Sequence, residues 1–153
     1  MKLSTLLGAL LLSVTPVFAD DYLYLKCEES IELDVLHAQT SKFIKKGTKS
    51  RFVVYGIAIK DKTIKGIALD ERVIETYDVV IDDDQLTYSG TQDVVDGDSS
   101  FQLMIDLKPP FDLVSKGRFI SNELPVIVDW KNKGLCKKVD ASVFEKALKE
   151  TES

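Results

Sequence analysis

Apolar and polar residues alternate along most of the chain, with the period of two that is typical of β-strands. Residues 101–107 show it clearly, because Phe101, Leu103 and Ile105 share one face while Gln102 lies on the other. The same pattern recurs along the chain and predicts strands at 22–28, 30–37, 50–60, 63–69, 72–82, 86–90, 101–107, 111–122, 125–130 and 135–139.

The segments between these strands are short and rich in turn-forming residues. Turns are predicted at 60–63, 82–85 and 131–134, and a loop is predicted at 96–100. Such connections leave no room for crossover helices, so neighbouring strands are expected to pair antiparallel. The sequence therefore predicts an all-β fold, either an antiparallel β-barrel or a barrel-like sandwich of about 8–10 strands.

One helix is predicted at the C-terminal end, at about 141–151. Ser142 and Glu145 have the spacing of a capping box. Phe144 and Leu148 lie on one helical face, and we expect them to pack onto the sheet. Residues 20–153 then form a single β-rich domain, since neither an internal repeat nor a linker is visible.

Apolar residues on the alternating faces give a predicted core. Its members are Leu23, Leu25, Ile31, Leu33, Val35, Phe52, Val54, Ile57, Ile59, Phe101, Leu103, Ile105, Phe119, Ile127 and Leu135. The segment 37–50 lacks this pattern and is basic, which predicts a solvated loop ending at Gly47 or one amphipathic turn. Its lysines could alternatively meet an anionic surface or ligand.

Residues 1–19 have the features of a secretory signal peptide. Lys2 precedes an apolar run from Leu6 to Val14, and Ala19 ends a short stretch with small residues at the cleavage positions. The run is too short to span a bilayer, so we expect cleavage rather than a stable membrane anchor. The predicted location is therefore the periplasm or the extracellular space.

The net charge is −5, which makes nucleic acid an unlikely partner because phosphate backbones are repelled. The two cysteines, Cys27 and Cys136, are expected to form a disulfide between the first and last strands, since exported chains meet an oxidising compartment. Two buried free thiols are the alternative. A redox-active pair would need a Cys-x-x-Cys spacing, which the sequence lacks.

Catalytic and metal motifs are sparse. His37 is the single histidine and is interpreted as a residue at a strand end. Asp93, Asp96 and Asp98 around a glycine are candidates for calcium, but the spacing is not that of an EF-hand, so no metal is predicted. No cofactor is predicted. A carboxylate-based hydrolase stays an alternative, because acidic residues are plentiful.

The order of Tyr24, Cys27, Ser89, Gly90 and Cys136 is similar to that in the small periplasmic inhibitors of C-type lysozyme. The resemblance implies an antiparallel barrel that inserts a serine from a Ser-Gly loop, together with a lysine, into the lysozyme cleft. The chain departs from that family in its tyrosine-to-cysteine spacing of three, in its greater length and in lacking a tryptophan-rich segment after Ser-Gly. Ser89 and Gly90 are thus candidate partner-binding residues.

The predicted function is that of an exported, non-catalytic binding or interaction protein. About eight strands can enclose one small apolar ligand or display loops to a protein partner. The inhibitor and the hydrolase are the alternatives. Neither the identity of the ligand nor the oligomeric state follows from the residues.

Overall fold

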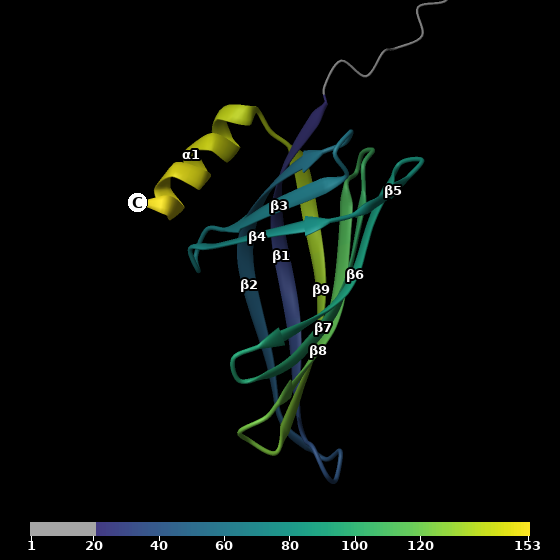
Figure 1. The fold of residues 1–153 in the computed structure, drawn as a ribbon, viewed down its shortest axis with the longest axis vertical. Helices are drawn as coiled ribbons and strands as arrows, with labels where there is room; N and C mark the ends of the chain where they lie inside the picture. The colour runs from purple at the N-terminus through teal and green to yellow at the C-terminus, as the bar shows by residue number, and fades with distance from the viewer. Residues whose placement is uncertain (1–20) are drawn as a thin grey trace, which may run out of the picture.

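The computed structural model describes residues 21–153, and the predicted signal peptide at 1–19 lies outside this range. A sheet of nine strands and one helix make up the fold (Figure 1). The strands are β1 (Tyr22–His37), β2 (Phe43–Ala58), β3 (Thr63–Ala68), β4 (Val73–Asp78), β5 (Val80–Asp82), β6 (Gln85–Val94), β7 (Gly97–Asp106), β8 (Asp112–Ser121) and β9 (Val126–Lys138), and the helix is α1 (Ala141–Glu152).

The strands join one antiparallel sheet in the order β4-β3-β2-β1-β9-β8-β7-β6-β5. The first and last strands, β1 and β9, pair at the centre of the sheet. The sheet curls until its edge strands β4 and β5 approach each other, and only Val79 separates them in the chain (Figure 1). The predicted fold class, an antiparallel barrel-like sheet with one short C-terminal helix, is confirmed.

Several strands are longer than predicted, because polar residues that resemble breaks lie inside them; the loop predicted at 96–100 is wrong, since β7 begins at Gly97. The segments 22–28 and 30–37 form the single strand β1, in which every residue from Tyr22 to Val35 pairs with β2 without a register shift. The turn predicted at 131–134 is wrong, since β9 runs through it. Asn132 and Gly134 occupy inward positions there, opposite Ile31 and Glu29.

Only residues 38–42 of the basic segment 37–50 form a loop, so the predicted loop ending at Gly47 is too long. Strand β2 begins at Phe43 and continues through Gly47 to Ala58. The acidic residues of β1 explain this extension, because Asp34 lies opposite Lys46 and the two side chains form an ion pair of 3.8 Å. Opposite charges on facing strands stabilise antiparallel pairing.

Apolar side chains fill one half of the barrel, which lies uppermost in Figure 1, and we call it the closed end. Its buried residues are Leu25, Cys27, Val53, Tyr55, Ile57, Ile64, Ala68, Val79, Leu86, Leu103, Ile105 and Leu113. Cys27 and Cys136 lie directly opposite each other on β1 and β9 and form the predicted disulfide. Closing a loop with a separation of 109 residues contributes about 4–5 kcal/mol on the chain-entropy model.

Helix α1 covers the outer face of β2 and β3. Phe144 and Leu148 pack against the buried Val54 and Ile67, as predicted. The predicted capping box is wrong, because the N-cap is Asp140, two residues before Ser142, and it makes no side-chain cap. No helix among residues 21–153 is long and apolar enough to cross a membrane.

Most of the predicted core is buried or partly buried, but Phe52 and Leu135 are 43% and 78% exposed. Both lie on the outer face of the sheet, since the inward positions beside them belong to Val53 and Cys136. Val54 shares the outer face with Phe52 but is buried by α1. A helix that covers one part of a strand cannot be inferred from the alternation of that strand.

Candidate functional site

The inner face of the barrel changes character halfway along its long strands. On β1 the inward alternation continues from Leu25 and Cys27 to Glu29, which is fully buried. The neighbours of Glu29 are Arg51 on β2 and Gly134 on β9. A Cβ atom on Gly134 would lie 3.1 Å from Cβ of Leu113, a tight contact, and 3.4 Å from Cγ of Glu29, so glycine fits closely between these two side chains.

Glu29 is the centre of a buried hydrogen-bond network. Its Oε1 accepts from the Tyr55 hydroxyl at 2.6 Å. Its Oε2 accepts from Nε of Arg51 at 2.9 Å and from Nδ2 of Asn132 at 2.7 Å. A buried carboxylate is tolerated when it is paired and hydrogen-bonded in this way. The network joins β1, β2 and β9 beneath the closed end.

The network leaves one buried acceptor unsatisfied. Asn132 is 4% exposed, and its Oδ1 has no hydrogen-bond partner among the described residues. The orientation of the amide follows from chemistry, because turning it over would replace the hydrogen bond from Nδ2 to Oε2 of Glu29 by a contact between two oxygens. A buried acceptor without a partner is uncommon and marks a place where a donor would be favourable.

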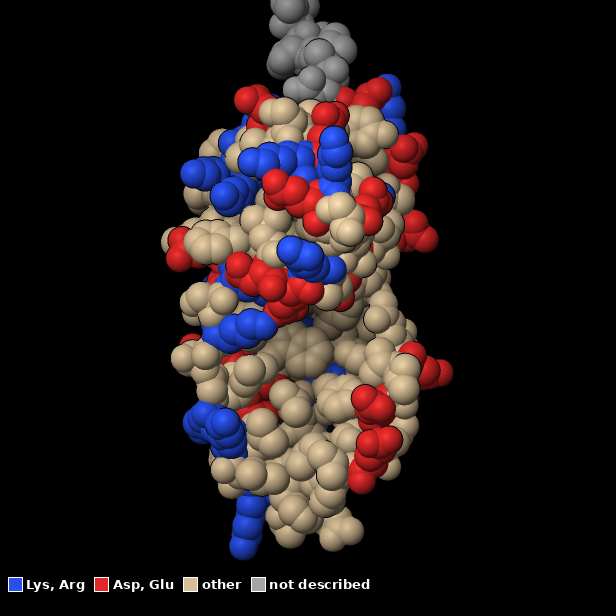
Figure 2. Space-filling model, turned by 90° about the vertical axis from the view of Figure 1, so that its left-hand side faces the viewer, with Lys and Arg blue, Asp and Glu red and all other residues tan. Residues whose placement is uncertain are grey.

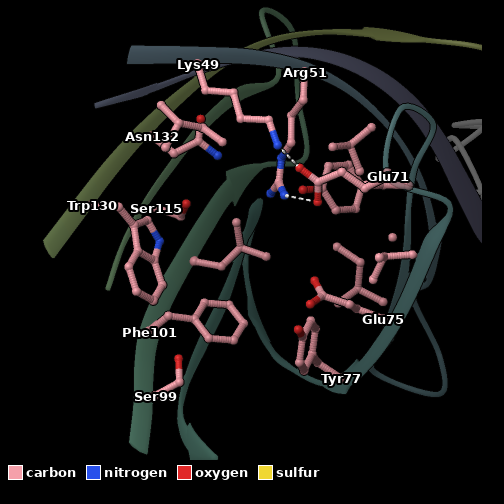
Figure 3. A pocket seen from close by; sticks show the side chains of 18 of the residues that line it. Lys49, Arg51, Glu71, Glu75, Tyr77, Ser99, Phe101, Ser115, Trp130 and Asn132 are labelled. Atoms are coloured by element: carbon pink, nitrogen blue, oxygen red, sulfur yellow. Dashed lines mark hydrogen bonds and ion pairs between the residues drawn. The ribbon is translucent and has the colours of Figure 1, made fainter. Parts of the chain in front are cut away.

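A second group of charges lies beside the network. Lys49 and Glu71 form an ion pair, and Nη1 of Arg51 lies 3.8 Å from Oε2 of Glu71 (Figure 3). The hydrogen bond from Lys49, more than the charge of either cation, lowers the pKa of Glu71 below its usual value. Arg51 therefore lies between two carboxylates, Glu29 and Glu71.

The protonation states of the network follow from its environment. Burial opposes a charge on Arg51, but the adjacent Glu29 outweighs it and raises the pKa of the guanidinium. Burial raises the pKa of Tyr55 well above its usual value, and the charge of Glu29 adds to this shift. At neutral pH both side chains are therefore donors to Glu29.

All of these residues except Glu29 line a cavity of about 440 Å³ inside the barrel. Figure 2 shows the molecule hollowed on the side where β4 lies, with mostly uncharged surface inside the hollow. The cavity is lined by Ile31, Leu33, Lys49, Arg51, Val53, Tyr55, Ile64, Gly66, Ala68, Glu71, Val73, Glu75, Tyr77, Gln92, Ser99, Phe101, Leu103, Ser115, Trp130 and Asn132. Its volume is in the range of small-molecule sites, which are mostly apolar with a few placed polar groups.

The cavity opens where the sheet is not closed. Strand β5 pairs only with the first residues of β6, from Gln85 to Thr87, so the rest of β6 has no strand on that side within the described sheet. Side chains span the gap instead, because the ring of Tyr77 on β4 lies 4.6 Å from Tyr88 and 5.1 Å from Phe101. This aromatic group forms one end of the cavity.

Trp130 forms part of the opposite wall. It lies inward on β9 beside Gly117 of β8, and a Cβ atom on Gly117 would come within 2.0 Å of its ring. Only glycine therefore admits the indole in this position. In Figure 3 Trp130 and Phe101 lie on one side of the cavity, and Glu75 and Tyr77 lie on the other.

The carboxylates of the cavity are not arranged as an acid–base pair facing each other. Glu71 and Glu75 come from the same wall, with Val73 between them on the inward face. Glu71 is engaged by Lys49 and Arg51, and Glu29 is engaged by its three donors. Glycoside hydrolysis needs two carboxyl groups on opposite sides of the bond that breaks. The geometry therefore gives the hydrolase alternative no support.

Ser89 and Gly90 lie in the middle of β6, paired with Gln102 and Phe101, and not in a loop. Ser89 is exposed on the outer face, where it borders a groove of about 670 Å³ that also contains Lys116. Gly90 faces inward beneath Tyr88. The role that the lysozyme-inhibitor resemblance implies for Ser89 and Gly90 stays a prediction.

The other sequence candidates lie away from the cavity. Asp93 and Asp98 pair across the β6–β7 hairpin, with Asp96 in its turn. Within residues 21–153, no three His, Cys, Asp or Glu side chains converge as metal ligands would. His37 ends β1, and its Nδ1 accepts from the backbone N–H of Gln39 at 3.3 Å.

Sequence reasoning finds apolar residues of the cavity, such as Ile31 and Phe101, but misses its polar ones. The pattern places Lys49 in a solvated loop and Asn132 in a turn, and it gives no inward role to Arg51 or Glu29. One signal was available for Glu29, because the inward alternation of β1 runs through it in phase with both Cys27 and Ile31.

The chain matches no protein-family model, and no curated protein matches its sequence. Functional inference therefore rests on the cavity and its chemistry.

Proposed function

We propose that this chain is a non-catalytic binding protein that holds a small, largely apolar ligand in the cavity of the barrel. The single observation that carries the proposal is the cavity itself, about 440 Å³ in volume, with Asn132 Oδ1 unsatisfied in a side chain of its wall. Apolar and aromatic walls supply the affinity for such a ligand, and a few polar groups fix its orientation.

The proposal includes a place of action outside the cytoplasm. The features of residues 1–19 favour export, and the Cys27–Cys136 disulfide is stable only in an oxidising compartment. We infer a periplasmic or extracellular carrier or sensor of its ligand. Its surroundings are aqueous, so a cavity that shields an apolar molecule from water has a clear physical use.

The construction of the site favours binding without large rearrangement. Strand pairing fixes the backbone on either side of Glu29, and the hydrogen bonds of Tyr55, Arg51 and Asn132 fix that wall of the cavity. A preformed site binds more tightly than a mobile one, because less conformational entropy is lost.

A neutral probe tests the proposal. Isothermal titration calorimetry with decan-1-ol should give saturable binding to the unmodified protein. Ser99 faces the cavity from β7, so Ser99→Trp should fill its mouth and weaken binding by about ten-fold or more. The adjacent Ser100 faces outward on the same strand, and Ser100→Trp is the matched control that should bind like the unmodified protein. Absence of binding to the unmodified protein, or equal binding to both variants, would contradict the proposal.

A further inference from the structure

We infer that the cavity selects ligands that carry a positively charged amine, with Glu75 as the counter-charge. This inference rests on the proposed function and adds to it the chemical class of the ligand. It comes from the charge balance of the cavity, from the aromatic rings beside Glu75 and from the unsatisfied oxygen of Asn132.

The charges in and beside the cavity do not cancel. Glu29 is matched by Arg51, and Glu71 is matched by Lys49. Glu75 lies on the cavity wall and forms no ion pair within the part of the chain that the structure describes. Three carboxylates thus meet two cations, and a ligand cation would complete the balance.

The cations of the cavity are poor candidates for binding an anion. Arg51 already lies between Glu29 and Glu71, and Lys49 is bound to Glu71. A carboxylate ligand would have to displace one of these partners and would then lie close to the others. Like charges at such short separations repel each other.

Aromatic rings surround the position that a cation beside Glu75 would occupy. Tyr77 follows Glu75 on the inward face of β4, and Phe101 and Trp130 lie across the cavity (Figure 3). The negative face of an aromatic ring attracts an ammonium group, most strongly where water is excluded. Burial, together with the charge of Glu75, raises the pKa of Tyr77, so its hydroxyl stays protonated and hydrogen-bonds to that carboxylate.

Asn132 provides an independent observation. Its Oδ1 is buried, has no partner among the described residues and can only accept a hydrogen bond. A carboxylate ligand has no proton to donate to it, whereas an amine or ammonium group has several. Because Oδ1 has almost no accessible surface, a donor would reach it only after a shift of the wall, whereas the Glu75 carboxylate lines the cavity and accepts from Tyr77 alone among its neighbours on β4.

Three probes with the same apolar chain and different head groups test the inference: decylammonium, decan-1-ol and decanoate. Calorimetric titrations at about pH 7 keep the amine charged and the acid ionised. Decylammonium is expected to bind about ten-fold more tightly than decan-1-ol, and decanoate more weakly than either.

Two variants assign the preference to Glu75. Glu75→Gln keeps the shape of the side chain and removes its charge, and should bring decylammonium to within about two-fold of decan-1-ol. Asp78→Asn removes a carboxylate from the outward face of the same strand, and is expected to leave the preference unchanged.

The outcomes separate this inference from the proposed function. If decan-1-ol binds while decylammonium binds no more tightly, the selectivity inference is overturned and the cavity remains a binding site. The same conclusion follows if decanoate binds most tightly, or if Glu75→Gln leaves the ratio unchanged. If none of the three probes binds, the proposed function is overturned, and the inference falls with it.

Discussion

The closed end and the cavity are built from the same strands. The side chains that face inward are apolar at the closed end and partly polar in the cavity. Along β1, Leu25 and Cys27 face a packed apolar core, and two residues later Glu29 begins a polar network. Along β9, Cys136 belongs to the first region and Asn132 to the second. Because β1 and β9 pair in register, the change from apolar to polar inward side chains occurs at the same level of the barrel on both strands.

The difference teaches how a small barrel can be stable and hollow at once. Strands β3, β4 and β5 are short and close the sheet only toward the end where the disulfide lies, although inward residues of β3 and β4 also line the cavity. The long strands β1, β2, β6, β7, β8 and β9 extend beyond them and leave the opening. Burial of apolar surface at one end stabilises the fold, and the other end is free to keep a cavity.

A matched pair of leucines tests this division most directly. Leu86 is fully buried at the closed end, and Leu86→Ala should lower the free energy of unfolding by about 3 kcal/mol, because transfer and cavity terms add. Leu33 lines the cavity and is partly exposed, so Leu33→Ala should cost about 1 kcal/mol or less. Urea denaturation of both variants measures the difference. Equal losses would show that the cavity end stabilises the fold as much as the closed end.

The sequence was informative about the closed end because burial there follows simple alternation. Leu25, Ile57 and Ile105 were predicted in the core and are fully buried. Pairing of Cys27 with Cys136 followed from the export signal and was confirmed. The period-two pattern is sufficient to predict the buried residues, because one apolar face packs against another. The oxidising compartment is sufficient to predict the disulfide.

The cavity could not be predicted in the same way. Lys49 and Arg51 have the composition of a solvated loop, and Asn132 has the neighbours of a turn. Their inward orientation depends on Glu29, which is 103 residues from Asn132 in sequence and contacts it only through the pairing of β1 with β9. Rules based on local sequence patterns assign polar residues to the surface, and a buried polar network breaks these rules. Such exceptions are expected at functional sites.

The Glu29 network gives the next largest effect. Glu29→Gln removes the charge and turns one acceptor oxygen into a donor, so one of its three protein donors loses its acceptor. The loss in unfolding free energy should be about 2 kcal/mol, because buried polar groups without partners are costly. Glu28→Gln changes the adjacent, exposed residue and should stay within about 0.5 kcal/mol of the unmodified protein. Chemical denaturation compares the two. A stable Glu29→Gln variant would mean that the network does not hold the open half together.

The smallest expected effect concerns the ion pairs of Glu71 and depends on pH. The pKa of Glu71 is lower in the folded protein than its ordinary value of 4.5. Its contribution to stability is therefore complete above about pH 4.5 and is lost as the pH falls through the folded-state pKa. Since the side chain is 33% exposed, the contribution should be only about 0.2–1 kcal/mol.

Glu71→Gln isolates that contribution. The difference in unfolding free energy between the unmodified protein and this variant should be constant from about pH 7 to pH 5 and should shrink as the pH falls toward 3. Urea denaturation over this range measures it, with Asp78→Asn as a control that changes a carboxylate without an ion pair among the described residues. A difference that stays flat down to pH 3 would contradict the assignment. The charges around the cavity would then serve to orient a ligand and contribute nothing to the stability of the barrel.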